Sequence, residues 1–171
     1  MIPSKKLALG LTVLFFYACG YQLAKPPQYL SQNIQNLTIA EVKNRTLEAG
    51  LEQIYTQSLI QTIKSYTNLN LTEKNTARGI LKAELVKLDY TPLGYDQFGR
   101  VNLLEINLSA RLWLMNAGDE KVIWSSGLMQ VNEQYPVGDD FFSNYQLRRK
   151  ALEEICSRLA KSQIELLLAD F

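Results

Sequence analysis

The feature that most constrains the fold is a strict alternation of apolar and polar residues over residues 104–114. Every second residue in this stretch is apolar: Leu104, Ile106, Leu108, Ala110, Leu112 and Leu114. A repeat of two is typical of a β-strand that buries one face. The segment therefore predicts a long, half-buried antiparallel strand, which must belong to a sheet with a covering layer on its apolar side.

The preceding segment, residues 79–90, also alternates, but its phase changes partway along. Leu81 and Leu85 share one phase, whereas Val86 and Leu88 follow the other. A regular strand cannot change phase, because a slip of one residue turns every later side chain to the opposite face. We therefore predict a second strand with a bulge or sharp twist near Leu85–Val86.

Two other segments have the spacing of amphipathic helices. Apolar residues recur at steps of three and four over residues 47–66, and Thr46 is the predicted N-cap of this first helix. Residues 143–168 form the second helix, whose apolar side includes Cys156. A buried thiol packs as a small hydrophobe, and we favour this interpretation of Cys156 over a reactive thiol.

The order of the expected elements defines the fold class. They are a strand at 34–42, the first helix, a short strand at Leu69–Leu71, strands at 79–90, 104–114 and 121–131, and the second helix. This order predicts one α+β domain, a two-layer sandwich. Its two helices pack on one face of a mixed, mostly antiparallel sheet of four strands plus one short strand, and the first strand–helix–strand unit pairs in parallel.

Composition limits the chemistry that the chain can perform. The 171 residues include 0 His and 2 Cys, which excludes Ser-His and Cys-His nucleophile pairs and disfavours a zinc site. The net charge of +1 does not favour nucleic acid. Asp139–Asp140 is interpreted as a helix-start charge bias rather than a cation site. We expect a binding protein and not an enzyme, with no cofactor and no metal.

The first residues have the features of an export signal. Lys5 and Lys6 precede an apolar stretch that ends at Ala18 and is too short for the ~20 residues that span a bilayer. Cys19 directly after such a cut resembles a bacterial lipoprotein signal, in which this cysteine is acylated. The resemblance implies a signal peptide over residues 1–18, and a lipidated N-terminus and tether over residues 19–33. Plain secretion and an uncleaved short anchor remain as alternatives.

Two groups of residues are candidates for contacting a partner. The loop of residues 91–100 carries Tyr95 and Phe98 beside Arg100, and exposed aromatic residues next to Arg are typical of interface hot spots. The alternative is that these rings fold back over the sheet edge. The second group is Arg148, Arg149 and Lys150, which could contact phosphate or anionic lipid, or could form a solvated helix face.

Three features together resemble the LPS-assembly lipoprotein family, LptE. They are the start Cys19-Gly20-Tyr21-Gln22-Leu23, the segment Asn44-Arg45-Thr46-Leu47-Glu48-Ala49-Gly50-Leu51 before the first helix, and the later strand–strand–helix order. The resemblance implies an LptE-like domain over residues 34–171, anchored by lipid in the outer membrane. It also implies two partners, lipopolysaccharide and the β-barrel LptD, whose lumen the domain plugs and whose assembly it assists.

Within that resemblance, the nominated contacts with lipopolysaccharide or the barrel are Tyr95, Phe98, Arg100, Arg148, Arg149 and Lys150. A different class of function also fits the tether and the α+β body: a structural periplasmic lipoprotein of another envelope machine, such as a secretion or pilus apparatus. A third candidate, a lipoprotein hydrolase, would depend on Asp139 and Asp140.

Overall fold

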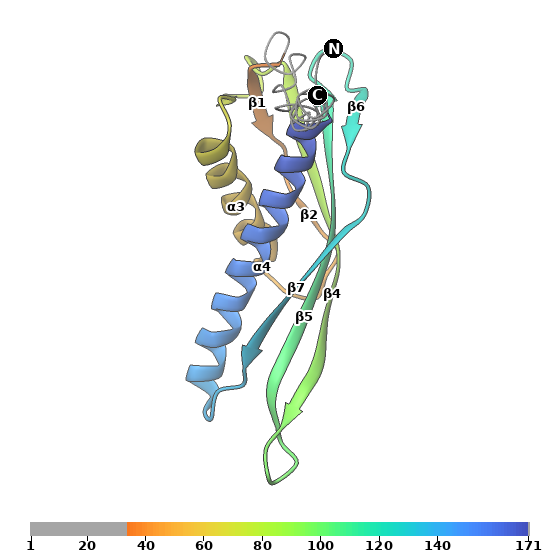
Figure 1. The fold of residues 1–171 in the computed structure, drawn as a ribbon. Coiled ribbons are helices and arrows are strands. Elements are labelled where there is room, and N and C mark those ends of the chain that lie inside the picture. Colours follow the sequence, from red (N-terminus) through yellow and green to blue (C-terminus); the bar gives the residue numbers. More distant parts are fainter. Residues whose placement is uncertain (1–33, 171) are drawn as a thin grey trace, which may run out of the picture.

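A computed structural model describes residues 34–170, so the predicted signal peptide, Cys19 and the tether lie outside the described residues. Within them, two helices cover one face of a 7-stranded sheet, and the predicted two-layer α+β fold is confirmed (Figure 1). The elements are β1 (Asn36–Ile39), β2 (Lys43–Asn44), α3 (Leu51–Tyr66), β3 (Asn70–Leu71), β4 (Gly79–Tyr95), β5 (Val101–Asn116), β6 (Val122–Ser125), β7 (Met129–Pro136) and α4 (Phe141–Ala169).

The long hairpin of β4 and β5 is the centre of the sheet. The two strands pair antiparallel from Gly79 opposite Asn116 to Tyr95 opposite Val101. Their register shifts between Leu85 and Lys87, which confirms the predicted bulge at Leu85–Val86. Leu81, Leu85 and Leu88 each lie opposite an apolar residue on the inward face of β5. The bulge therefore keeps all three on the buried face, although the alternation changes phase between them.

The sheet has more strands than expected. The strand predicted at 34–42 ends at Ile39, and the chain pairs with β4 again just beyond the predicted bounds, at Lys43–Asn44, as β2. The strand predicted at 121–131 is interrupted after Ser125, and Gly127 adopts a φ of 66° that interrupts the pairing. The chain then pairs with β5 again as β7. β1 pairs in parallel with both β3 and β4, as predicted for the first crossover.

The predicted start of the first helix is wrong. α3 begins at Leu51 after Gly50, whose φ is 83°, and Thr46 is not its N-cap. The segment before it is a loop held by Asn44, whose side-chain Nδ2 donates to the Glu48 carbonyl at 2.8 Å and to the Glu52 carboxylate at 2.7 Å. Because the Asn44 side chain makes these hydrogen bonds, residues 45–50 form a loop where the first helical turn was predicted. Leu47 lies in this loop and is fully exposed, so it is not part of the apolar stripe of α3.

The start of α4 has the cap that its acidic residues suggested. The Asp140 carboxylate accepts hydrogen bonds from the backbone N–H groups of Phe142 (2.9 Å) and Ser143 (3.0 Å). Because the backbone and side chain of Ser143 donate to this carboxylate, the pKa of Asp140 lies below its usual value. The helix then runs for 29 residues, starting two residues earlier than predicted.

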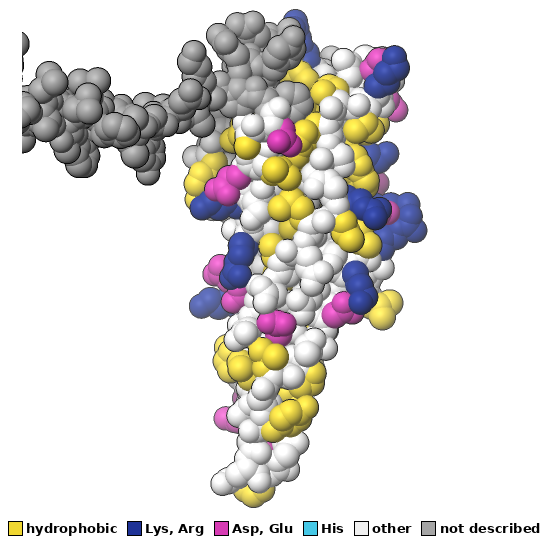
Figure 2. All heavy atoms as spheres, turned by 45° about the vertical axis from the view of Figure 1, so that its right-hand side comes forward, with side chains coloured by type: hydrophobic (Ala, Val, Ile, Leu, Met, Phe, Trp, Pro, Cys, Tyr) yellow, Lys and Arg dark blue, Asp and Glu magenta, His cyan; other side chains and the backbone are white. Residues whose placement is uncertain are grey.

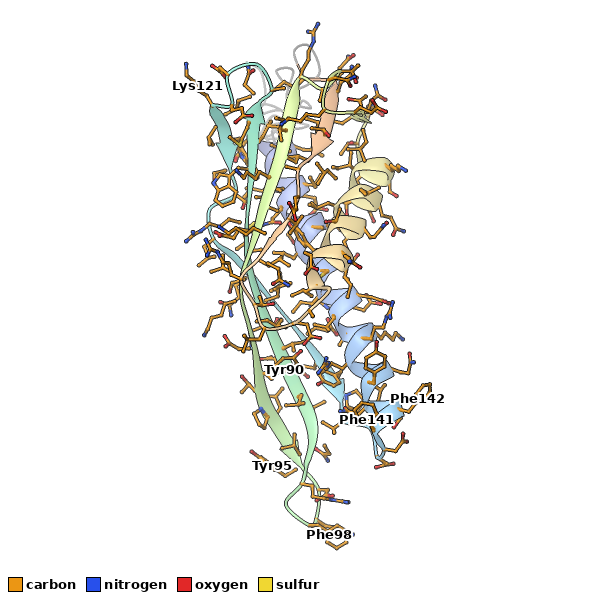
Figure 3. The ribbon with its side chains drawn as sticks, turned by 180° about the vertical axis from the view of Figure 1, so that it is seen from behind. Tyr90, Tyr95, Phe98, Lys121, Phe141 and Phe142 are labelled. Carbon is orange, nitrogen blue, oxygen red and sulfur yellow. The ribbon has the colours of Figure 1, made fainter. Side chains whose placement is uncertain are left out.

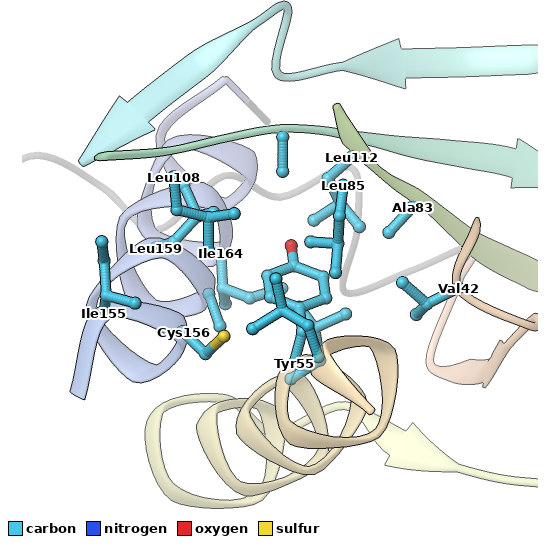
Figure 4. Close-up of a cluster of buried hydrophobic side chains, with 14 of the residues drawn as sticks. Val42, Tyr55, Ala83, Leu85, Leu108, Leu112, Ile155, Cys156, Leu159 and Ile164 are labelled. Carbon is cyan, nitrogen blue, oxygen red and sulfur yellow. The ribbon is translucent and has the colours of Figure 1, made fainter. Parts of the chain in front are cut away.

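The core lies between the helices and the sheet (Figure 4). The inward residues of β5 predicted from the alternation are buried from Ile106 to Leu114. α3 contributes Leu51, Tyr55, Leu59 and Ile63 at intervals of four residues. One polar link crosses the core: the Tyr55 hydroxyl donates to the side-chain oxygen of Gln163 on α4. Burial raises the pKa of Tyr55, so this hydroxyl remains protonated and available as a donor.

Cys156 is buried in this core, as predicted, and burial raises the pKa of its thiol from the usual 9.0 to about 12. At pH 8.5 we expect iodoacetamide to leave Cys156 unmodified in the folded chain and to alkylate it after unfolding in urea, measured on its peptide by mass spectrometry. Alkylation at equal rates in both states would contradict its burial. Folding favours the protonated thiol, because burial raises its pKa. The contribution of Cys156 to the free energy of unfolding is therefore fully present below about pH 9 and declines as the pH rises toward 12.

Candidate functional site

Most of the exposed aromatic side chains of the described residues gather at one end of the domain. This end, called the distal end below, comprises the turn between β4 and β5 and the first residues of α4 (Figures 1 and 3). Its exposed rings are Tyr95 and Phe98 on the turn, and Phe141, Phe142 and Tyr145 on α4. β1, where the described chain begins, lies at the opposite end of the domain (Figure 1).

Asp96 organises the β4–β5 turn. Its carboxylate accepts from the backbone N–H groups of Phe98 (2.8 Å) and Arg100 (2.9 Å), and the Arg100 Nε donates to it at 2.7 Å. These hydrogen bonds, led by that of the Arg100 backbone, lower the pKa of Asp96. Gly99 completes the turn at a φ of 77°. The turn is therefore held in one shape by its own polar groups.

This shape turns the aromatic rings to solvent. Tyr95 is 60% exposed and Phe98 is 73% exposed, so neither ring folds back over the sheet edge. The Arg100 guanidinium lies 5.4 Å from the centre of the Phe98 ring, within the range of a cation–π contact. Phe98 and Arg100 thus contact each other at the tip of the hairpin, and Tyr95 is exposed at the end of β4 next to this turn.

Sequence reasoning missed the second aromatic group. Phe141 and Phe142 occupy the first turn of α4, before its buried stripe begins at Ala151, and they are 89% and 69% exposed. Tyr145 is one turn further along and is also exposed. The available signal was the pair of phenylalanines directly after Asp139–Asp140: apolar residues at a charged helix start have no core to face.

The three nominated basic residues do not form one patch. Successive residues on a helix point about 100° apart. The Arg148 side chain contacts Glu48 at 2.7 Å, and Glu48 also accepts from the Tyr90 hydroxyl at 3.1 Å. Arg149 instead pairs with Glu153 at 3.1 Å along the helix surface, and Lys150 makes no ion pair within residues 34–170.

The different partners of Arg148 and Arg149 predict different effects on stability. Arg148→Ala breaks a link between α4 and the loop before α3, and it leaves the half-buried Glu48 with one partner fewer. We expect it to lower the free energy of unfolding by about 1.5 kcal/mol. Arg149→Ala removes an exposed pair within one helix, so its effect should be about 0.5 kcal/mol or less. Urea unfolding followed by circular dichroism compares them, and equal effects would contradict the assignment.

The surface away from the distal end is different in character. On the face shown in Figure 2, Lys and Arg side chains lie over the wider upper part, whereas hydrophobic side chains are spread over both the upper part and the narrow lower part. In the part of the chain that the structure describes, neither helix is both long and apolar enough to cross a bilayer. The same residues contain no group of three or more acidic or cysteine side chains that could hold a metal ion.

Solved structures with the same fold were found at low sequence identity. Rare lipoprotein B from Shewanella oneidensis aligns with a TM-score of 0.52 at 11% identity, covering 79% of this chain and 95% of that one. Protein XCC0632 from Xanthomonas campestris aligns with a TM-score of 0.55 at 9% identity, covering 80% and 84% of the two chains. These similarities support the fold alone. No curated protein matches the chain.

The family was identified by its sequence model. The model of LptE, described as lipopolysaccharide-assembly, matches residues 34–164. The match runs from two residues before β1 to the last turns of α4, so it covers both layers of the fold and both parts of the distal end. The chain therefore belongs to the LptE family of lipopolysaccharide-assembly lipoproteins.

Proposed function

We propose that this protein is a non-enzymatic outer-membrane lipoprotein that plugs and helps assemble the LptD barrel and binds lipopolysaccharide on its way to the cell surface. Membership of the LptE family supports the general role in lipopolysaccharide assembly. The single observation that carries the more specific role is the aromatic distal end, which lies opposite the end where the chain enters the domain.

The length of the domain fits a position along the axis of a membrane barrel. β4 has 17 residues, which at about 3.3 Å per residue extend roughly 55 Å. A bilayer with its headgroups is about 40–45 Å thick. A domain tethered through Cys19 at the inner leaflet is thus long enough to bring its distal end to the outer interface, where aromatic side chains are favoured.

The face of the sheet opposite the helices also suits a plug, because the interior of a membrane barrel is polar. Glu105 and Asn107 of β5 point to this face. The Glu105 carboxylate accepts from the side chains of Asn132 (2.9 Å) and Asn107 (3.3 Å), which lowers its pKa. Asn107 in turn accepts from Gln130 at 3.3 Å. This network offers donors and acceptors to a polar wall, whereas an apolar face would require a dry partner.

Co-purification from envelopes tests the proposal. The affinity-tagged full chain, extracted in mild detergent, should recover a large β-barrel whose electrophoretic mobility changes on heating. Depletion of the protein should reduce lipopolysaccharide at the cell surface. Recovery without a barrel, or a loss of secretion or motility with normal surface lipopolysaccharide, would contradict the proposal and favour another envelope machine.

The lipid anchor has a separate test in Cys19→Ala. Without the acylated thiol, the protein should leave the membrane fraction and its electrophoretic mobility should change, because several acyl chains hold a protein on a bilayer permanently. Unchanged fractionation and mobility would exclude the anchor while leaving the question of the barrel open.

A further inference from the structure

A polar groove runs between α3 and α4, away from the distal end. It has a volume of about 640 Å³, which is within the range of ligand sites in proteins. Its α3 side is a column of uncharged polar residues at intervals of four: Gln53, Gln57, Gln61 and Ser65. Residues at this interval stand above one another on a helix, about 6 Å apart along its axis.

The composition of this column is unusual for an exposed helix face, which normally carries charged side chains. α3 has one acidic residue in its first turn and one basic residue in its last turn, and neither lines the groove. The side-chain amides of Gln53, Gln57 and Gln61 have no hydrogen-bond partner within residues 34–170. Each amide therefore offers two donors and an acceptor to a ligand.

The α4 side of the groove sets its charge. Arg149 is neutralised by Glu153 at 3.1 Å. Glu154, the remaining charged residue of the lining, makes no ion pair in the described part of the chain. The groove thus carries a small excess of negative charge, which disfavours phosphate and carboxylate groups. At the C-terminal end of α3, the Tyr66 ring is 58% exposed. The Lys161 ammonium lies 5.0 Å from the centre of this ring and also pairs with Glu165 at 3.8 Å, so a sugar can stack only on the part of the ring that Lys161 leaves open.

From these observations we infer that the α3–α4 groove binds an uncharged oligosaccharide segment. Each sugar hydroxyl is both a donor and an acceptor, and this matches a row of side-chain amides and Ser hydroxyls better than a row of charged groups. The inference rests on the proposed function, because lipopolysaccharide brings an oligosaccharide to this protein. It adds a site that is separate from the distal end and specific for the sugar portion.

Saturation-transfer NMR tests the groove, with the full chain in detergent and, as the probe, a lipopolysaccharide oligosaccharide that has no acyl chains, phosphates or acidic sugars. The wild type should bind this probe, and Gln57→Ala/Gln61→Ala should bind at least tenfold more weakly. Alanine is the best helix former, so this variant should retain its fold. The matched control is Gln146→Ala, which changes an exposed glutamine of α4 outside the groove and should bind as the wild type does.

Equal binding by the groove variant and the control, or no binding of the probe by the wild type, would overturn the inference. A photo-crosslinking residue at position 57 that captures a polypeptide in envelopes, without probe binding, would overturn it in favour of a protein ligand. Barrel co-purification is measured on the same variants. If the barrel is recovered with every variant, the proposed function is supported, whether or not the groove binds the probe. If the wild type does not recover the barrel, the proposed function is contradicted, whatever the result of the probe experiment.

Discussion

Replacing Leu112 by alanine should lower the free energy of unfolding by about 2–5 kcal/mol. Leu112 is fully buried on β5, in the part of the core that lies between the sheet and both helices (Figure 4). Removing its side chain exchanges packed contacts for a cavity that the long hairpin cannot readily close. Urea unfolding of the full chain in detergent, followed by circular dichroism, measures the change.

Leu93→Ala is the matched control for this experiment, because it makes the same chemical change on the neighbouring strand β4. Leu93 is 45% exposed near the distal end, so its effect should be within about 0.5 kcal/mol of zero. Similar losses in the two variants would show that Leu112 does not face a core between the sheet and the helices.

The second large effect is expected at the distal end, and it rests on the proposed function. Phe98→Ala/Phe141→Ala removes the two most exposed rings, one from each part of the distal end. Aromatic residues at the centre of an interface typically contribute more than 1 kcal/mol each, so together they should change binding by at least tenfold. We expect at least tenfold less barrel to be recovered with the variant than with the wild type.

This double variant should keep the stability of the wild type, because both rings face solvent in the isolated domain. Val122→Ala is the control: it shortens a side chain that is 57% exposed on β6, and β6 lies at the other end of the domain (Figure 1). A double variant that unfolds like the wild type and recovers the barrel equally well would exclude the distal end as a contact surface.

The fold was predictable where local pattern and tertiary packing agree. Residues 104–114 form a strand in the structure because their apolar side is also the side that the helices cover. The bulge near Leu85 was predictable for the same reason, since a change of phase is incompatible with a regular buried face. The acidic start of the second helix was predictable as a charge bias at Asp139–Asp140, and the structure adds that Asp140 is the N-cap.

The structure differs from the sequence-based prediction where a few polar or glycine residues outweigh the apolar pattern. Asn44 bonds to Glu48 and Glu52, and this delays the start of α3 although Leu47 has helical spacing. Gly127 divides β6 from β7 within an otherwise continuous pattern. Of the candidate site, the hairpin cluster was predictable from Tyr95, Phe98 and Arg100. The position of these residues at the same end of the domain as the start of α4 was not predictable, because this arrangement depends on how the chain returns along β7.

The central claim is that the distal end of this lipoprotein lies inside the barrel of the lipopolysaccharide translocon. The most direct measurement places a photo-crosslinking amino acid at position 98 of the full chain and irradiates growing cells. The account predicts a covalent adduct with a large β-barrel whose mobility changes on heating. A chain that is stable in the envelope and forms no barrel adduct from position 98 would contradict it.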